Sequence, residues 1–176
     1  MATSFYSVWL VPQEPDLSYF QTLINDLANR FSTVSFCPHV TLYSGYIPAL
    51  LDIQRVYSAL ASHPPVELEI MHLSYETRFS KTLYVQLRTS PGLSQLVHQL
   101  VAHIADAQPP IVDPHVSLLY HHLEADIKET LIRDMAMPRP NIRFNQLQVI
   151  AAPQNFETQE HVSKLRHVHS QFLNTP

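Results

Sequence analysis

Two short stretches of this chain decide its fold: P-H-V-T-L at residues 38–42 and P-H-V-S-L-L-Y at residues 114–120. Both are rich in β-branched and apolar residues, which predicts strands, and a proline in the first position of a strand removes no ladder hydrogen bond. Alternate residues of a strand point to the same face, so the histidine and the hydroxyl residue of each stretch share one face. The valine and leucine next to them face the other way, toward an expected core.

The segments around these stretches follow one another in the same order in both halves of the chain. In each half we expect a strand, a helix, the proline-histidine strand, a second helix and a last strand. The expected strands are residues 5–11, 38–43, 66–73, 82–87, 114–120 and 142–152, and the expected helices are residues 16–30, 49–61, 90–104 and 125–135. Internal repetition of this kind predicts two related lobes.

We therefore expect an α+β fold in which residues 1–176 form a single bilobal domain. The two lobes are pseudo-symmetric, and each is a β-α-β-α-β unit with a mainly antiparallel sheet, helices outside and a central cleft between the lobes. Lobe one covers about residues 1–77 and lobe two about residues 78–156. Residues 157–176 form a polar C-terminal tail whose few apolar residues favour a helix.

Composition limits the partners of the protein. Its 176 residues are 45% hydrophobic and 15% charged, which is typical of a folded globular chain. A net charge of -4 with 11 Lys+Arg offers no basic face to long nucleic acid, so we expect a small phosphate ligand instead. The single cysteine, Cys37, excludes an internal disulfide. With no apolar run near the roughly 20 residues of a membrane span and no signal peptide, we expect a cytoplasmic monomer without a membrane partner.

The paired imidazoles and hydroxyls suit cleavage of a phosphodiester without a metal ion. Histidine has an unperturbed pKa of about 6.5, so one imidazole can take a proton from water while another gives a proton to the leaving oxygen. We predict His39 and His115 as this catalytic pair, and Thr41 and Ser117 as hydroxyls that bind the phosphate oxygens. A single H-x-[ST] pattern is more often structural, but two copies in one repeated frame favour catalysis.

Other histidines in the chain could suggest a metal site. The close pairs are His121 with His122 and His167 with His169. No carboxylate or cysteine stands at ligand spacing from either pair, and adjacent surface histidines are common. We therefore expect no metal site and no cofactor.

On the residues quoted so far, the sequence resembles the 2H phosphoesterase superfamily, whose mark is two H-x-[ST]-x motifs on pseudo-symmetric lobes. Within it, the sequence is most similar to the plant and yeast cyclic phosphodiesterases. The likeness rests on Y-S-V-W-L-V-P at residues 6–12 and on the two histidine stretches. The order of elements agrees over nearly the whole chain, and close motif identity is confined to those three segments.

The resemblance implies a metal-independent hydrolase of RNA and tRNA splicing metabolism. Its substrates would be ADP-ribose 1″,2″-cyclic phosphate, opened to the 1″-phosphate, and nucleoside 2′,3′-cyclic phosphates, opened to the 2′-phosphates. By analogy His115 would activate water and His39 would protonate the leaving oxygen, although pseudo-symmetry leaves these roles open. Tyr120 would bind substrate, provided that its strand ends or bulges first. Trp9 and Tyr43 are further candidates to stack on a base or ribose, and both could instead be core residues.

Two other functions stay open at this point. One is an RNA-end enzyme of the same superfamily, either a 2′,3′-cyclic phosphodiesterase or a 2′–5′ RNA ligase. The low basic content counts against it, because a long substrate needs an extended phosphate-binding surface. The other is a nucleotide-binding module without turnover, which would keep its ligand after replacement of both histidines.

Overall fold

The computed structural model describes residues 4–47, 50–104, 107, 112–137 and 139–174. The strands are β1 (Ser4–Pro12), β2 (Val40–Ile47), β3 (Val66–Ser74), β4 (Leu83–Leu87), β5 (His115–Leu119), β6 (Asn141–Ala151) and β7 (Arg166–Phe172). The helices are α1 (Asp16–Phe31), α2 (Leu50–Leu60), α3 (Pro91–Ala102), α4 (Ala125–Asp134) and α5 (Gln159–Ser163), and a short 3-10 helix, η1 (Phe79–Lys81), precedes β4.

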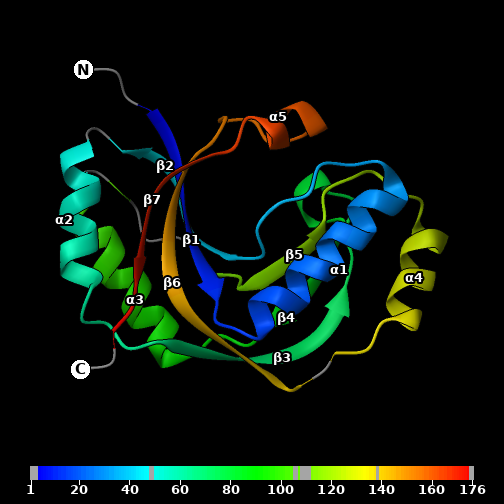
Figure 1. Ribbon diagram of the computed structural model, residues 1–176, viewed down its shortest axis with the longest axis horizontal. Helices are drawn as coiled ribbons and strands as arrows, with labels where there is room; N and C mark the ends of the chain where they lie inside the picture. Colours follow the sequence, from blue (N-terminus) through cyan, green and yellow to red (C-terminus); the bar gives the residue numbers. More distant parts are fainter. Residues whose placement is uncertain (1–3, 48–49, 105–106, 108–111, 138, 175–176) are drawn as a thin grey trace.

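Within these residues the strands form one antiparallel seven-stranded sheet in the order β2-β1-β6-β3-β4-β5, with β7 paired to β6. The two halves of the sheet share β6, since residues 141–144 pair with β3 and residues 144–151 pair with β1. Figure 1 shows β6 curving as it passes from one half to the other. The predicted α+β fold with a mainly antiparallel sheet is confirmed.

The curvature of the sheet brings its two ends together. Strands β2 and β5 lie at opposite ends of the pairing order, yet they contact each other. Helix α1 packs against β5 as well as against β1, and α2 and α3 pack against each other at the far end of the molecule (Figure 1). The fold therefore carries both histidine stretches to one place.

Local sequence signals define the start of α3. Ser90 caps α3, as its hydroxyl oxygen accepts a hydrogen bond from the Leu93 amide at 3.2 Å, and Pro91 is the first helical residue. The expected first residue of the second helix, Ala49, lies outside the described residues.

The C-terminal segment differs from the expected polar tail. It contains the five-residue helix α5 followed by strand β7, which pairs with residues 146–151 of β6. Most β7 side chains are exposed, so its sequence shows no buried face that would predict a strand. Backbone pairing with β6 holds this segment instead.

One apolar core runs through both halves of the sheet, and it includes Val8 and Leu10 of β1. The residues of β1 that alternate with them, Trp9 and Val11, belong to a separate small cluster with Ile150. Trp9 therefore lies on the face of the sheet opposite the main core. Among the residues that the structure describes, no helix is long and apolar enough to cross a membrane.

Candidate active site

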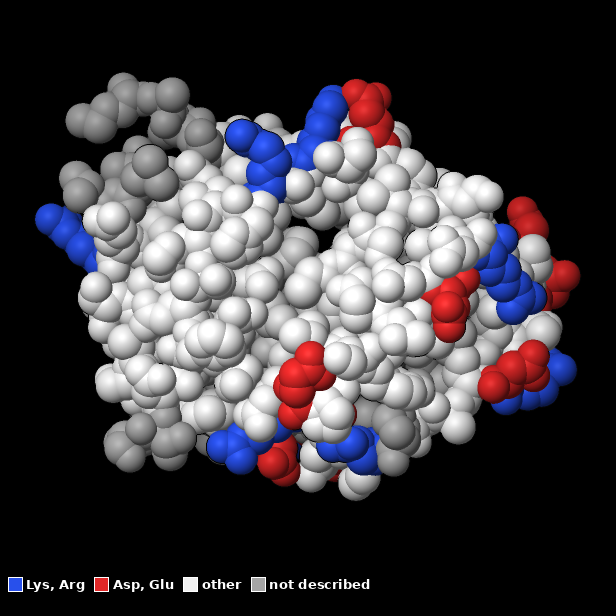
Figure 2. Space-filling model, viewed as in Figure 1, with Lys and Arg blue, Asp and Glu red and all other residues white. Residues whose placement is uncertain are grey.

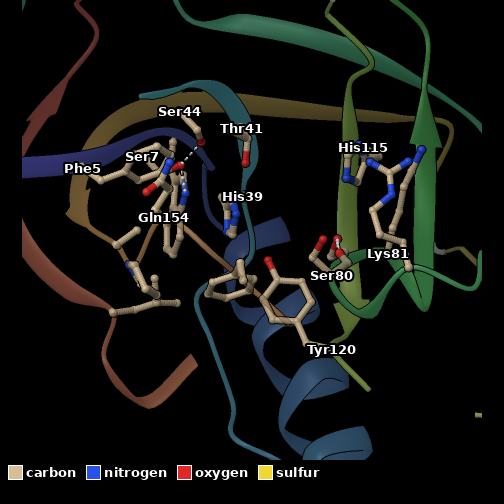
Figure 3. Close-up of a pocket in the computed structure, with 17 residues that line it drawn as sticks. Phe5, Ser7, His39, Thr41, Ser44, Ser80, Lys81, His115, Tyr120 and Gln154 are labelled. Carbon is tan, nitrogen blue, oxygen red and sulfur yellow. Dashed lines mark hydrogen bonds between the residues drawn. The ribbon is translucent and has the colours of Figure 1, made fainter. Parts of the chain in front are cut away.

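A cavity of about 350 Å³ is lined by both histidine stretches. Figure 3 shows His39 and Thr41 on one side of it, and His115 and Lys81 on the other. The cavity-lining residues include every predicted site residue except Tyr43, namely Trp9, His39, Thr41, His115, Ser117 and Tyr120. The fold thus brings together two groups that lie far apart in the sequence.

A β-bulge in β2 explains why Tyr43 does not line the cavity. Trp9 of β1 pairs with Thr41, but the preceding residue of β1 pairs with Tyr43, so Leu42 is an extra residue in β2. An extra residue reverses the alternation of side chains from that point on. Ser44 therefore follows Thr41 on the cavity face, while Tyr43 packs against the main core.

An equivalent bulge in β5 places Tyr120 in the cavity. Tyr84 of β4 pairs with Ser117, and the preceding residue of β4 pairs with Leu119, so Leu118 is the extra residue. Strand β5 ends at Leu119, and Tyr120 follows directly. The condition set for Tyr120 in the sequence, a strand end or a bulge before it, is therefore met in both ways.

On the first side of the cavity, His39 is enclosed and its ring is fixed. His39 Nδ1 donates to the carbonyl oxygen of Cys37 at 2.7 Å, which leaves Nε2 as the free nitrogen. The indole of Trp9 stacks on the imidazole with 3.6 Å between ring centroids and 4° between planes. Trp9 is itself held by its Nε1, which donates to Ser7 Oγ at 2.8 Å. Burial lowers the pKa of His39 to about 3, so the neutral imidazole is strongly favoured.

On the second side, His115 makes the same backbone contact in more polar surroundings. His115 Nδ1 donates to the carbonyl oxygen of Asp113 at 2.8 Å, again two residues earlier. The Tyr84 ring meets the imidazole edge-on at 5.5 Å, where Trp9 stacks on the other side. Burial and the positive charge of Lys81 lower the pKa of His115, while Asp113 opposes them through its hydrogen bond and its carboxylate.

A buried ion pair lies beside His115. Lys81 Nζ contacts Asp113 Oδ2 at 2.7 Å and Glu76 Oε1 at 2.9 Å, and only 4% of the lysine side chain is exposed. Burial by itself would lower the pKa of Lys81, but the two carboxylates raise it above its ordinary value. Arg78, at the cavity rim, pairs with the same Glu76 at 2.8 Å. The cations near His115 are therefore matched by carboxylates.

Comparisons with known proteins give the family. The sequence model described as "2′-5′ RNA ligase superfamily" matches residues 19–150, which include both histidine stretches. The chain belongs to this superfamily, the 2H phosphoesterases. A cyclic phosphodiesterase of Arabidopsis thaliana is 28% identical over 125 residues, which are 70% of this chain and 69% of that protein.

Solved structures agree with the superfamily fold. Escherichia coli LigT complexed with phosphate has a TM-score of 0.57 and 16% identity, with 99% of this chain and 100% of LigT covered. The protein TT0787 of Thermus thermophilus has a TM-score of 0.60 and 10% identity, with 97% of this chain and 98% of TT0787 covered. At these identities the two likenesses show the fold alone.

The two hydroxyls predicted to bind phosphate, those of Thr41 and Ser117, lie in different surroundings. Ser117 is buried, and its Oγ donates to the carbonyl oxygen of Ser80 at 2.8 Å. Thr41 is exposed at the cavity wall. Tyr120 is buried, with its ring stacked on Phe36 at 3.8 Å, and burial raises the pKa of its hydroxyl.

Gln159 of α5 connects the two sides and could not have been found from the sequence. Its Oε1 accepts from the Val34 amide at 2.8 Å, and its Nε2 donates to the carbonyl oxygen of Tyr120 at 2.5 Å. One side chain thus links the segment that leads to His39 with the segment that leaves β5. No local pattern marks such a glutamine, because both of its partners are backbone groups distant in sequence.

The remaining residue clusters suggest no further chemistry at this site. In the described ranges, no group of three or more His, Cys, Asp or Glu side chains could hold a metal ion. Cys37 is half-buried, and burial raises the pKa of its thiol to about 11, so it is protonated near neutrality.

Four further residues join the site in the structure although the sequence did not mark them, namely Ser7, Ser44, Asp113 and Gln154.

Proposed function

We propose that this superfamily member is a metal-independent phosphodiesterase that opens small cyclic phosphates between His39 and His115. One observation carries the proposal: both imidazoles donate from Nδ1 to a carbonyl two residues earlier and line one cavity with Nε2 free. Two free imidazole nitrogens around one pocket supply the base and the acid that an in-line displacement at phosphorus needs.

The surroundings of the two histidines support different roles. His39, with a pKa of about 3, is neutral and ready to accept a proton at Nε2. His115 is less buried and has the Asp113 carboxylate 4.0 Å from Nδ1, so it holds a proton more readily than His39 does. We therefore assign His39 as the base and His115 as the acid, which reverses the order that the resemblance implied.

In the proposed step one proton is removed on one side of the phosphorus and one is supplied on the other. His39 Nε2 takes a proton from water while the water oxygen bonds to phosphorus. The bond between phosphorus and the leaving oxygen breaks, and His115 gives its Nε2 proton to that oxygen. The Thr41 hydroxyl donates to a non-bridging oxygen as negative charge builds up on it, while the Ser117 hydroxyl donates to the Ser80 carbonyl. The product is a phosphate monoester with one free hydroxyl.

The size of the cavity supports a small substrate. Its volume of about 350 Å³ lies near the lower end of the range of ligand pockets, roughly 300–1,000 Å³. Nucleoside 2′,3′-cyclic phosphates and ADP-ribose 1″,2″-cyclic phosphate are the proposed substrates. The name of the Arabidopsis relative, a cyclic phosphodiesterase, supports this class.

The description of the superfamily favours a second candidate, an enzyme of RNA 2′,3′-cyclic phosphate ends or a 2′–5′ RNA ligase. A long RNA would need a row of cations along its path. On the face shown in Figure 2, Lys and Arg are scattered and interspersed with Asp and Glu. That distribution, with the net charge of -4, favours the small substrate.

Phosphorus NMR of the purified protein in EDTA tests the proposal. The protein is offered ADP-ribose 1″,2″-cyclic phosphate, a nucleoside 2′,3′-cyclic phosphate and an oligonucleotide with a cyclic end in separate samples. We expect conversion of a small cyclic phosphate to a monoester. Conversion of none of the three refutes the proposal, activity that requires an added divalent metal refutes its metal independence, and strong preference for the oligonucleotide selects the RNA enzyme.

A further inference from the structure

The cavity extends past the histidines to an end without charged side chains. Figure 3 shows Phe5, Ser7 and Gln154 beyond His39, on the side away from His115. These residues line the same cavity, together with Ser44 of β2. Strand β1 and the segment after β6 supply this end, and the neutral hydroxyls of Ser7 and Ser44 hydrogen-bond to each other at 3.0 Å.

Tyr46 holds the two largest side chains of this end in place. Its hydroxyl donates to Gln154 Oε1 at 3.0 Å, which fixes the amide plane and leaves the Nε2 hydrogens available as donors. The edge contact between the rings of Tyr46 and Phe5, at 5.5 Å and 90°, fixes the orientation of Phe5. An aromatic ring and an amide donor are thus oriented side by side by one tyrosine.

The opposite end of the cavity has a different character. There Arg78 and Lys81 line the wall, and both are paired with carboxylates. That end is built from ion pairs, whereas the neutral end suits a flat, uncharged group that carries hydrogen-bond acceptors. Nucleobases have this chemistry, since every base has a π-face and acceptor atoms on its edge.

We infer that Phe5, Gln154 and Tyr46 form a nucleobase subsite beside the phosphate position. This inference rests on the proposed cyclic phosphodiesterase function and deepens it. In a nucleoside 2′,3′-cyclic phosphate the base is on the same ribose as the cyclic phosphate. In ADP-ribose 1″,2″-cyclic phosphate that ribose has no base and continues into a pyrophosphate. The subsite therefore favours nucleoside 2′,3′-cyclic phosphates as the substrate class.

The test compares a substrate with a base and one without. We would measure kcat/KM for adenosine 2′,3′-cyclic phosphate and for methyl riboside 2,3-cyclic phosphate with the wild type, Gln154→Ala and Tyr46→Phe. Stacking and one amide donor predict that the wild type prefers the adenosine substrate by on the order of tenfold or more. Both variants should lose the share of that preference due to the amide donor, about two- to tenfold, while turnover of the riboside stays within about twofold.

Tyr75→Phe is the matched control, because the hydroxyl of Tyr75 also donates to one side-chain oxygen, that of Glu129 at 2.9 Å, and Tyr75 does not line the cavity. Equal kcat/KM on both substrates in the wild type, or an equal loss on both in the variants, overturns the subsite.

Turnover of neither substrate by the wild type would refute the proposed function. The subsite would then be judged by equilibrium binding of adenosine 2′-phosphate against methyl riboside 2-phosphate. Weaker binding of the adenosine ligand alone in Gln154→Ala and Tyr46→Phe supports the subsite, and unchanged binding overturns it.

Discussion

The His39 side of the cavity and the His115 side share a short motif, a β-bulge and a hydrogen bond from Nδ1 to a backbone carbonyl. On the first side Trp9 stacks on the imidazole, and 5% of His39 is exposed. On the second, Tyr84 and the ion-paired Lys81 flank the imidazole, and 25% of the His115 side chain is exposed. The repeated motif therefore fixes the orientation of each ring, while the neighbouring strands set its affinity for protons.

Removing either histidine should produce the largest effect. His39→Ala and His115→Ala each delete a proton-transfer group, so we expect kcat to fall at least about 100-fold in both variants. Steady-state kinetics on a nucleoside 2′,3′-cyclic phosphate would measure this.

His98→Ala is the matched control for the two histidine variants. Its Nδ1 also donates to a backbone carbonyl, that of Ser94 at 2.7 Å, but it is exposed on α3 and does not line the cavity. Its kcat should equal that of the wild type. A wild-type rate in either cavity variant would contradict the two-histidine mechanism.

Removal of the Thr41 or the Ser117 hydroxyl should give the next largest difference in kcat. Ser117 already donates to Ser80, whereas Thr41 is exposed at the cavity wall. Thr41→Val should therefore cost about 100-fold in kcat, and Ser117→Ala should cost about tenfold or less. Circular dichroism of both variants would confirm that they fold. A larger loss in Ser117→Ala than in Thr41→Val would show that the hydrogen bond to Ser80 is exchanged for one to the substrate.

The pH dependence of kcat/KM should distinguish the His115 side of the cavity from the His39 side. His115 must be protonated to act as the acid, and its pKa lies below the ordinary value, so kcat/KM should fall as the pH rises through that lowered pKa. Removing the charge of Arg78 by Arg78→Gln should move this fall to higher pH. Removing the carboxylate by Asp113→Asn should move it to lower pH, by up to about one pH unit. Shifts in the opposite directions would contradict the assignment of His115 as the acid.

The smallest effect concerns stability. The pKa of His39 is about 3 in the folded chain and near 6.5 in the unfolded one, so the unfolded chain binds more protons below pH 6.5. The stability that this group contributes is therefore fully present above pH 6.5 and is lost as the pH falls toward 3. Urea unfolding between pH 6 and 4 should show a flatter decline in His39→Gln than in the wild type. Equal slopes in the two proteins would contradict the burial argument.

The sequence could predict the features that depend on local patterns. The two proline-histidine stretches lie within short windows, and strand β5 agrees with the strand expected there. The strand expected over residues 38–43 begins only at Val40, where its pairing with Leu10 of β1 starts, so His39 directly precedes β2. The two stretches bring His39 and His115 to one cavity with their hydroxyl partners. In β5, strand alternation puts Ser117 on the face of His115, and Thr41 of β2 lines the cavity two residues after His39.

The features that the sequence could not predict depend on contacts between segments that lie far apart in the chain. The bulge at Leu42 reverses the alternation and puts Ser44 in the cavity rather than Tyr43, and a bulge is not visible in a string of apolar residues. Gln154 and Gln159 act through partners far away in the chain, and β7 has no buried face. The proton affinities of the two histidines also come from neighbouring strands, so the motif by itself suggested symmetry where the structure shows a difference.

The most direct test of the central claim uses a nucleoside 2′,3′-cyclic phosphate whose 3′ oxygen is replaced by sulfur. A thiolate leaves without being protonated, so this substrate has no need of the acid. If His39 is the base and His115 the acid, His115→Ala should open the sulfur substrate at a rate close to that of the wild type, while His39→Ala stays inactive. Recovery of His39→Ala alone would show the opposite roles, and failure of both variants would contradict the acid and base account.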